Sequence, residues 1–186
     1  MIDQELELLK ELKQKSPWTG EYQSKKEKFI WLLTELCNIH NMDVPKLVIP
    51  KYPNQFEWTK KYCGDCAFRY RHKGKIRIKN FSVITLLHEF KHWIDFHNSK
   101  LKWKTKKEKE KREYDAYYYS TRRFYAVWPE RIKTLSEFVE NNIFETKTAQ
   151  LRMRQMKEKY QDTDVDYKLR AETRAIIDIV LGEVWC

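Results

Sequence analysis

The amino-acid sequence predicts a mostly helical α+β fold, with a small antiparallel sheet or hairpin ahead of the central helix and a helical C-terminal extension. The chain has only four Gly and five Pro in 186 residues, which favours long helices over a turn-rich all-β fold. Apolar residues recur at helical spacing through most of the chain, whereas one short region alternates apolar and polar residues. These two periodicities together indicate a small β element within a helical framework.

The composition indicates one folded domain over residues 1–186. Hydrophobic residues make up 41% and aromatic residues 15% of the chain, and a disordered chain usually lacks the aromatic surface that offsets the entropy of ordering. The formal net charge of +10 makes nucleic acid a conceivable partner, because positive charge raises encounter rates with polyanions. The run 104–112 mixes basic and acidic residues, however, which is more typical of a solvated helix face.

The first predicted elements are two amphipathic helices and a short strand. Residues 3–15 place leucines at helical spacing. This helix ends at Ser16-Pro17, because the residue before proline disfavours helix. Residues 21–40 form a stronger helical pattern. The proline-containing stretch 41–54 indicates a loop around one strand at 46–49.

A β-hairpin is predicted next. Residues 67–71 and 75–79 each alternate in polarity, and the intervening residues 72–74 contain a glycine and predict a turn. Ile76 and Ile78 then share one face of the hairpin, and the basic residues share the other.

Helical patterns complete the chain. Residues 82–97 carry a wide apolar stripe, and residues 107–127 form a helix that ends ahead of Pro129. The segments near 130–160 and 165–184 also have helical periodicity. The central part of the fold is therefore two long helices that follow the hairpin.

The helix at 82–97 carries the sequence His88-Glu89-Phe90-Lys91-His92. The two histidines are four residues apart, so both imidazoles project from one face, a spacing that lets two ring nitrogens bind one tetrahedral metal at roughly 2.0–2.1 Å. Glu89 lies beside the first histidine and can reach a metal-bound water without binding the metal itself, which is the position of a general base.

The alternative is a chance match. With five His in the chain, simple frequency counting gives a His-Glu-x-x-His motif about once in a hundred sequences of this composition. In that case His88 and His92 would decorate the exposed face of a core helix. The apolar opposite side of the helix favours instead a buried helix whose histidine pair faces a cleft.

A catalytic zinc ion (Zn2+) needs a third protein ligand and an open position for water. The downstream candidates are Asp95, His97, Glu110, Glu113 and Asp115. His97 points away from the ligand face on an ideal helix. Asp95 could approach as an alternative ligand, although in such a place it more often holds a ligand histidine through a hydrogen bond. Glu113 has small residues on its own helix face, which would let its helix pack closely and bring the carboxylate to the metal.

This arrangement resembles the gluzincin metallopeptidases. A His-Glu-x-x-His helix followed about twenty residues later by Glu-x-x-Ala on another helix is similar to the minimal gluzincins and the related phage-type peptidases. The resemblance covers roughly residues 28–127, which would form a zincin-like catalytic core. It implies His88, His92 and Glu113 as zinc ligands and Glu89 as the catalytic base and acid.

The resemblance also implies a protein or peptide substrate. The hairpin strand with Ile76, Arg77 and Ile78 resembles the edge strand that lies antiparallel to the substrate in zincins. Such a strand would hold an extended peptide by main-chain hydrogen bonds. Residues 129–186 carry no part of the resemblance and are expected to form a helical extension.

Cys63 and Cys66 have the CxxC spacing that structural metal sites and redox pairs use. A structural zinc site needs four ligands, and the sequence has no second pair, since Cys37 and Cys186 are isolated. The alternative is a turn beside the hairpin with incidental thiols.

The sequence therefore predicts a zinc-dependent metallopeptidase that hydrolyses peptide bonds with a zinc-bound water activated by Glu89. The alternative is a non-catalytic basic helical protein that binds nucleic acid or a protein partner. The chain begins with polar and acidic residues rather than a signal peptide and has no uninterrupted apolar stretch of about 18 residues. We therefore expect a cytoplasmic protein with reduced thiols and no membrane partner.

Overall fold

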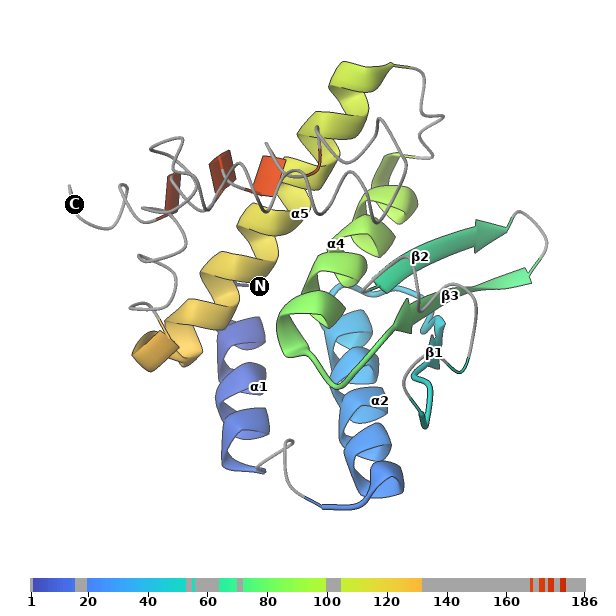
Figure 1. Cartoon of the computed structure of the whole chain (residues 1–186), viewed down its shortest axis with the longest axis vertical. Coiled ribbons are helices and arrows are strands. Elements are labelled where there is room, and N and C mark those ends of the chain that lie inside the picture. Colours follow the sequence, from blue (N-terminus) through green and yellow to red (C-terminus); the bar gives the residue numbers. More distant parts are fainter. Residues whose placement is uncertain are drawn as a thin grey trace. The chain divides into compact units, whose positions relative to one another are not determined.

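The computed structural model describes residues 2–15, 20–52, 55, 64–69, 72–99 and 105–131, together with 168, 171–172, 174–175 and 178–179. These residues are mostly helical with a small sheet, which confirms the predicted α+β class (Figure 1). The chain divides into two compact units, residues 1–101 and 102–186. Because this boundary falls inside 28–127, the single-domain organisation stays a prediction. None of the described helices combines the length and apolar character that a membrane span requires.

The first unit begins with two helices, α1 (Ile2–Gln14) and α2 (Tyr22–Ile39), which pack against each other. Their bounds agree closely with the predicted helices at 3–15 and 21–40. Each helix buries one apolar stripe, made of Leu8, Leu9 and Leu12 in α1 and of Phe29, Leu32, Leu33 and Leu36 in α2. This shared apolar contact stabilises both helices, because helices of such length are marginal in water on their own.

Three strands form one sheet in the order β1-β3-β2, with bounds β1 (Lys46–Val48), β2 (Gly64–Arg69) and β3 (His72–Ile78). β2 and β3 pair antiparallel, which confirms the predicted hairpin. β1 pairs parallel with β3, so the sheet as a whole is mixed and not antiparallel as predicted. A three-residue strand carries no local signal for its partner or direction, because both depend on the long connection that follows it.

The structure corrects the predicted substrate-binding edge. Ile76, Arg77 and Ile78 lie on β3, which is the central strand. Ile76, for example, pairs with Leu47 on β1 and with Cys66 on β2. The main-chain groups of a strand with partners on both sides are used within the sheet and are not offered to a peptide. The alternation of Ile76 and Ile78 with polar residues indicates a strand with one buried face, and it carries no signal for the place of that strand in the sheet.

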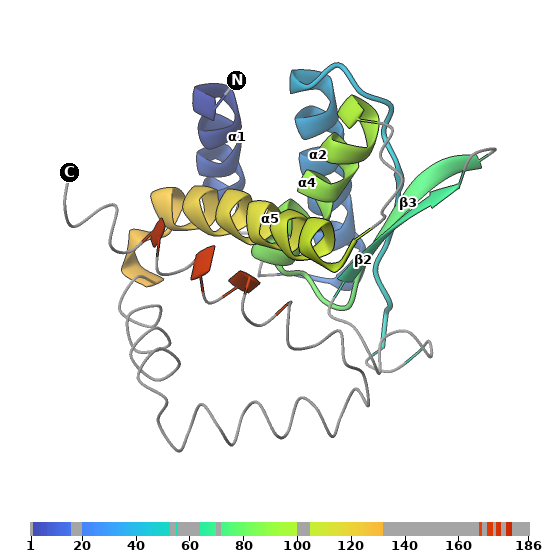
Figure 2. The same cartoon turned by 90° about the horizontal axis from the view of Figure 1, so that it is seen from above.

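Helix α4 (Val83–Ser99) follows β3 and carries the predicted histidines. Ser82 caps its start, since Ser82 Oγ accepts a hydrogen bond from the backbone N–H of Thr85 at 3.3 Å. The helix contacts β2 and β3, and Figures 1 and 2 show α2 and α4 on one side of the strands. Its apolar stripe is buried as predicted and consists of Val83, Leu86, Leu87, Phe90, Trp93 and Ile94.

Gly74 lies within β3, so the predicted turn at 72–74 is wrong. The strand already begins at His72, which pairs with Arg69 on β2. A Cβ atom on Gly74 would overlap the indole ring of Trp93 on α4. Glycine is therefore required here by the close approach of a helix, and it resembles a turn residue only in the local sequence.

The second unit contains α5 (Lys106–Val127) and a short 3₁₀ turn, η1 (Pro129–Arg131). A capping box starts α5. Thr105 Oγ1 accepts from the N–H of Glu108 at 3.2 Å, and the Glu108 carboxylate accepts from the N–H of Thr105 at 2.8 Å. These reciprocal bonds fix the first turn close to where the pattern at 107–127 predicts it.

The C-terminal segment contributes helical residues to the second unit. All described residues between 168 and 179 are helical, as predicted for 165–184, whereas the predicted helix near 130–160 lies outside the described residues. Three apolar side chains at four-residue spacing form its buried face: Ala171, Ala175 and Ile179.

Candidate metal centre

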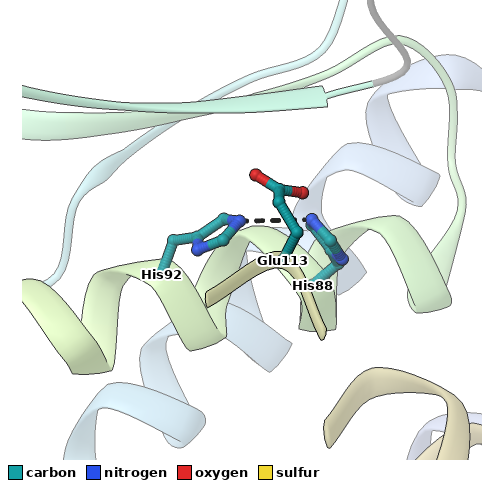
Figure 3. Close-up of side chains that lie close together, drawn as sticks. All are labelled: His88, His92 and Glu113. Carbon is teal, nitrogen blue, oxygen red and sulfur yellow. Dashed lines mark hydrogen bonds between the residues drawn. The ribbon is translucent and has the colours of Figure 1, made fainter. Parts of the chain in front are cut away.

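Two buried histidines face each other on α4. His88 and His92 are 8% and 6% exposed, and their Nε2 atoms lie 3.2 Å apart (Figure 3). The ring planes are close to perpendicular, at 87°, with centroids 4.8 Å apart. A tetrahedral zinc ion with nitrogen ligands at about 2.05 Å would hold two such nitrogens about 3.3 Å apart. The pair thus already has the spacing that one metal ion requires.

The burial of both rings contradicts the alternative in which the histidines decorate an exposed helix face. His88 and His92 are about one helical turn apart, so the helix geometry places both side chains on the same face of α4. In Figure 3 the two Nε2 atoms point toward each other. A metal ion binds the unprotonated nitrogen of a neutral imidazole, and two such nitrogens aimed at one space are a suitable pair of ligands.

Glu113 is the third member of this group. It lies on α5 and is 8% exposed. One of its carboxylate oxygens, one ring nitrogen of His88 and one ring nitrogen of His92 all lie within 4.8 Å of one another (Figure 3). Among the described His, Cys, Asp and Glu residues, these three form the one group at metal-binding spacing. Two imidazole nitrogens and one carboxylate oxygen match the ligand set of a catalytic zinc site with an open fourth position.

Glu89, the predicted base, is also buried, with 6% of its surface exposed. It follows His88 directly on α4, so its side chain leaves the helix about 100° away from that of His88. It therefore borders the histidine face without belonging to the group of ligand atoms. This is the placement expected of a carboxylate that acts on a water molecule and leaves the metal to its neighbours.

Asp95 lies on α4 outside the ligand group. Its carboxylate accepts a hydrogen bond from Lys91 Nζ, four residues earlier on the same helix, and forms an ion pair with it. Nothing in this contact supports Asp95 as a zinc ligand. Its role as a hydrogen-bond partner of a ligand histidine stays a prediction.

The cysteine prediction is not tested. Cys63 lies outside the described residues, and Cys66 is described only by its place on β2, as the partner of Ile76. Cys37 is a free, buried thiol of α2. Burial, with a smaller contribution from the nearby Asp43 carboxylate, raises the pKa of Cys37 to about 12, so this thiol is not a reactive thiolate at neutral pH.

The sequence interpretation missed a buried pair in the first unit. Glu5 on α1 is fully buried, and its Oε1 lies 2.6 Å from Nε2 of His40, the C-cap residue that follows α2. His40 also packs edge-on against Phe90 of α4, with ring centroids 5.5 Å apart. The available signal was an acidic residue on the leucine face of α1, since a carboxylate is rarely buried without a partner.

Comparisons with protein-family models, with curated proteins and with solved structures found no match to this chain. The resemblance to gluzincins therefore stays a prediction that rests on the motif, and the function has to be argued from the residues of the site.

Proposed function

We propose that this chain is a zinc-dependent metallopeptidase of the gluzincin type, with His88, His92 and Glu113 as zinc ligands. The observation that supports it most directly is the 3.2 Å separation of the two Nε2 atoms. Two histidines placed by chance on a helix have no reason to be buried together with their ring nitrogens aimed at each other. The carboxylate of Glu113 adds an oxygen ligand of the type that catalytic zinc sites use.

In this proposal Glu89 performs the proton transfers. A zinc ion held by His88, His92 and Glu113 would polarise the scissile carbonyl and lower the pKa of a bound water molecule. Glu89 accepts a proton from the water that attacks the carbonyl carbon, and it returns that proton to the amine that leaves when the C–N bond breaks. The burial of Glu89 keeps bulk water away from this exchange and strengthens its electrostatic interactions.

We assign the substrate peptide to β2 and no longer to β3, because β3 is the central strand. β2 is an edge of the described sheet and contacts α4, the helix that carries the histidines. An edge strand offers N–H and C=O groups to which an extended peptide can bind antiparallel. The substrate class is thus an unfolded segment or an exposed loop of a protein.

The test combines zinc content with cleavage of fluorescently labelled casein. We expect one zinc ion per wild-type chain and a large loss of zinc in His92→Ala and Glu113→Ala. Glu110→Ala, which removes another carboxylate of α5, is the matched control and should retain zinc. Glu89→Gln should also retain zinc but lose cleavage by a factor of about 10²–10⁴, because only the proton transfer is removed.

The two readouts separate the metal site from the mechanism. Wild-type protein that takes up no zinc on reconstitution would contradict the ligand assignment. Zinc-loaded Glu89→Gln that cleaves at the wild-type rate would contradict the role of Glu89 and leave the metal site intact.

A further inference from the structure

The alternation of β3 sorts its residues onto two faces of the sheet. Ile76 and Ile78 are fully buried on the face toward α4. Lys75 and Arg77 alternate with them, Lys79 directly follows the strand, and all three are partly exposed. Since successive residues of a strand point to opposite sides, Lys75 and Arg77 belong to the face turned away from α4, and Lys79 continues the alternation one residue beyond the strand.

The neighbouring strand extends this positive charge. Lys46 of β1 is exposed and is the register partner of Lys75, and Leu47 is buried as the partner of Ile76. Paired residues of adjacent strands share a face, so Lys46 lies on the same side of the sheet as Lys75. We call this set of four cations the basic sheet face: Lys46, Lys75, Arg77 and Lys79.

The basic sheet face is compact. Adjacent strands lie about 4.8 Å apart, and alternate residues along a strand are about 7 Å apart. The register partner of Arg77 on β2 is acidic, Asp65, so the four cations of the basic sheet face are set against this one acid among their described register partners. Lys46 and Lys75 are register partners, so two like charges lie directly opposite each other, an arrangement that costs free energy and that a bound anion would stabilise.

We propose that the basic sheet face binds the phosphate backbone of a nucleic acid. A nucleic acid is the partner of matching charge, since its closely spaced phosphates complement a row of cations, and the net charge of +10 attracts it over longer distances. A membrane surface fits less well, because stable peripheral anchoring combines basic residues with apolar groups that insert, and the isoleucines of β3 are buried on the opposite face.

The chemistry of this surface also sets the expected mode of binding. Lysine and arginine on a sheet face meet phosphates, which carry no sequence information, so we expect little sequence preference. The surface lies on the face turned away from α4, whose side chains His88 and His92 form the candidate metal site. Nucleic-acid binding is therefore independent of the proposed peptidase activity and can be tested without it.

The experiment measures the affinity for a labelled DNA duplex and a labelled RNA single strand by fluorescence anisotropy, between about 50 and 200 mM salt. The variant Lys75→Gln/Arg77→Gln/Lys79→Gln should weaken binding at low salt by about tenfold or more. It should also reduce the slope of log K against log salt by about 2–3, because each phosphate contact contributes about 0.7–0.9.

A matched triple variant provides the control. Lys13→Gln/Lys106→Gln/Lys107→Gln removes the same net charge from exposed positions elsewhere and should change the affinity by less than about threefold. The double variant Lys75→Gln/Lys79→Gln, which keeps Arg77, repeats the test with a smaller perturbation. Circular dichroism checks that each variant is folded.

Three results would overturn the proposal. Equal losses in both triple variants would attribute binding to the overall charge. Failure of the wild-type protein to bind either the DNA or the RNA probe at the lowest salt concentration would contradict nucleic-acid binding altogether. Binding to phosphatidylserine vesicles that depends on the basic sheet face, without binding to nucleic acid, would reassign this face to a membrane surface.

Discussion

Gly74 and Trp93 meet where α4 packs on the sheet, and a side chain on Gly74 would overlap the indole ring. The indole is held from two further sides, since Trp93 Nε1 donates to the carbonyl of Asp43 at 3.0 Å and the ring stacks on Phe96 with centroids 5.9 Å apart. A ring fixed in this way cannot shift without breaking other contacts. Glycine at position 74 is therefore a packing requirement of the α4 interface.

The substitution Gly74→Ala tests this requirement by the sign of its effect. An alanine in unstrained, open surroundings would stabilise the protein slightly by restricting the unfolded chain. Against a fixed indole, we expect the free energy of unfolding to fall by about 1–3 kcal/mol, as measured by urea denaturation. The same substitution in a Trp93→Leu background should cost less, because the ring is gone. An identical loss in both backgrounds would show that Trp93 is not the cause.

Helix α5 is held at two places. The capping box at Thr105 fixes its start, and Tyr114 Oη donates a hydrogen bond to the Asp178 carboxylate at 2.6 Å. Burial first, and then this hydrogen bond, raise the pKa of Tyr114 to about 12. Because Glu113 is the preceding residue, the contact steadies the part of α5 that carries the proposed third ligand.

The raised pKa of Tyr114 predicts a loss of stability at alkaline pH. The folded protein holds the phenol proton more tightly than the unfolded chain, whose tyrosine pKa is about 10. The stabilisation is thus fully present below about pH 10 and is lost as the pH rises through about 12. Urea denaturation at several pH values should show a shallower decline for Tyr114→Phe than for the wild type. Parallel declines would contradict a coupling between the Tyr114 proton and folding.

At the scale of the whole molecule, local patterns predict the elements, and distant connections decide how strands pair. The helices at 21–40 and 82–97 follow from apolar residues at helical spacing and are confirmed as α2 and α4. The central place of β3 and the parallel direction of β1 could not be predicted, because strand order depends on chain segments outside either strand.

The residues of the candidate site also differ in whether a local sequence pattern predicts their placement. The orientation of His88 and His92 follows from one helix turn, so the sequence alone predicts it. Glu113 is twenty-one residues beyond His92 on another helix, and the small residues on its helix face together with the resemblance to gluzincins pointed to it. The pair of Glu5 and His40 was missed because it requires the packing of α1 on α2, which no local pattern contains.

If one ion binds residues of both α4 and α5, its removal should destabilise the molecule as a whole. A ligand present at 100 times its dissociation constant stabilises the folded state by about 2.7 kcal/mol. For a chain of this length we expect zinc-loaded wild-type protein to melt about 5–11 °C above EDTA-treated protein in scanning calorimetry. Glu89→Gln should keep this difference, because Glu89 is not a ligand, whereas His92→Ala and Glu113→Ala should abolish it. A shift that persists in both ligand variants would place the stabilising ion at another site.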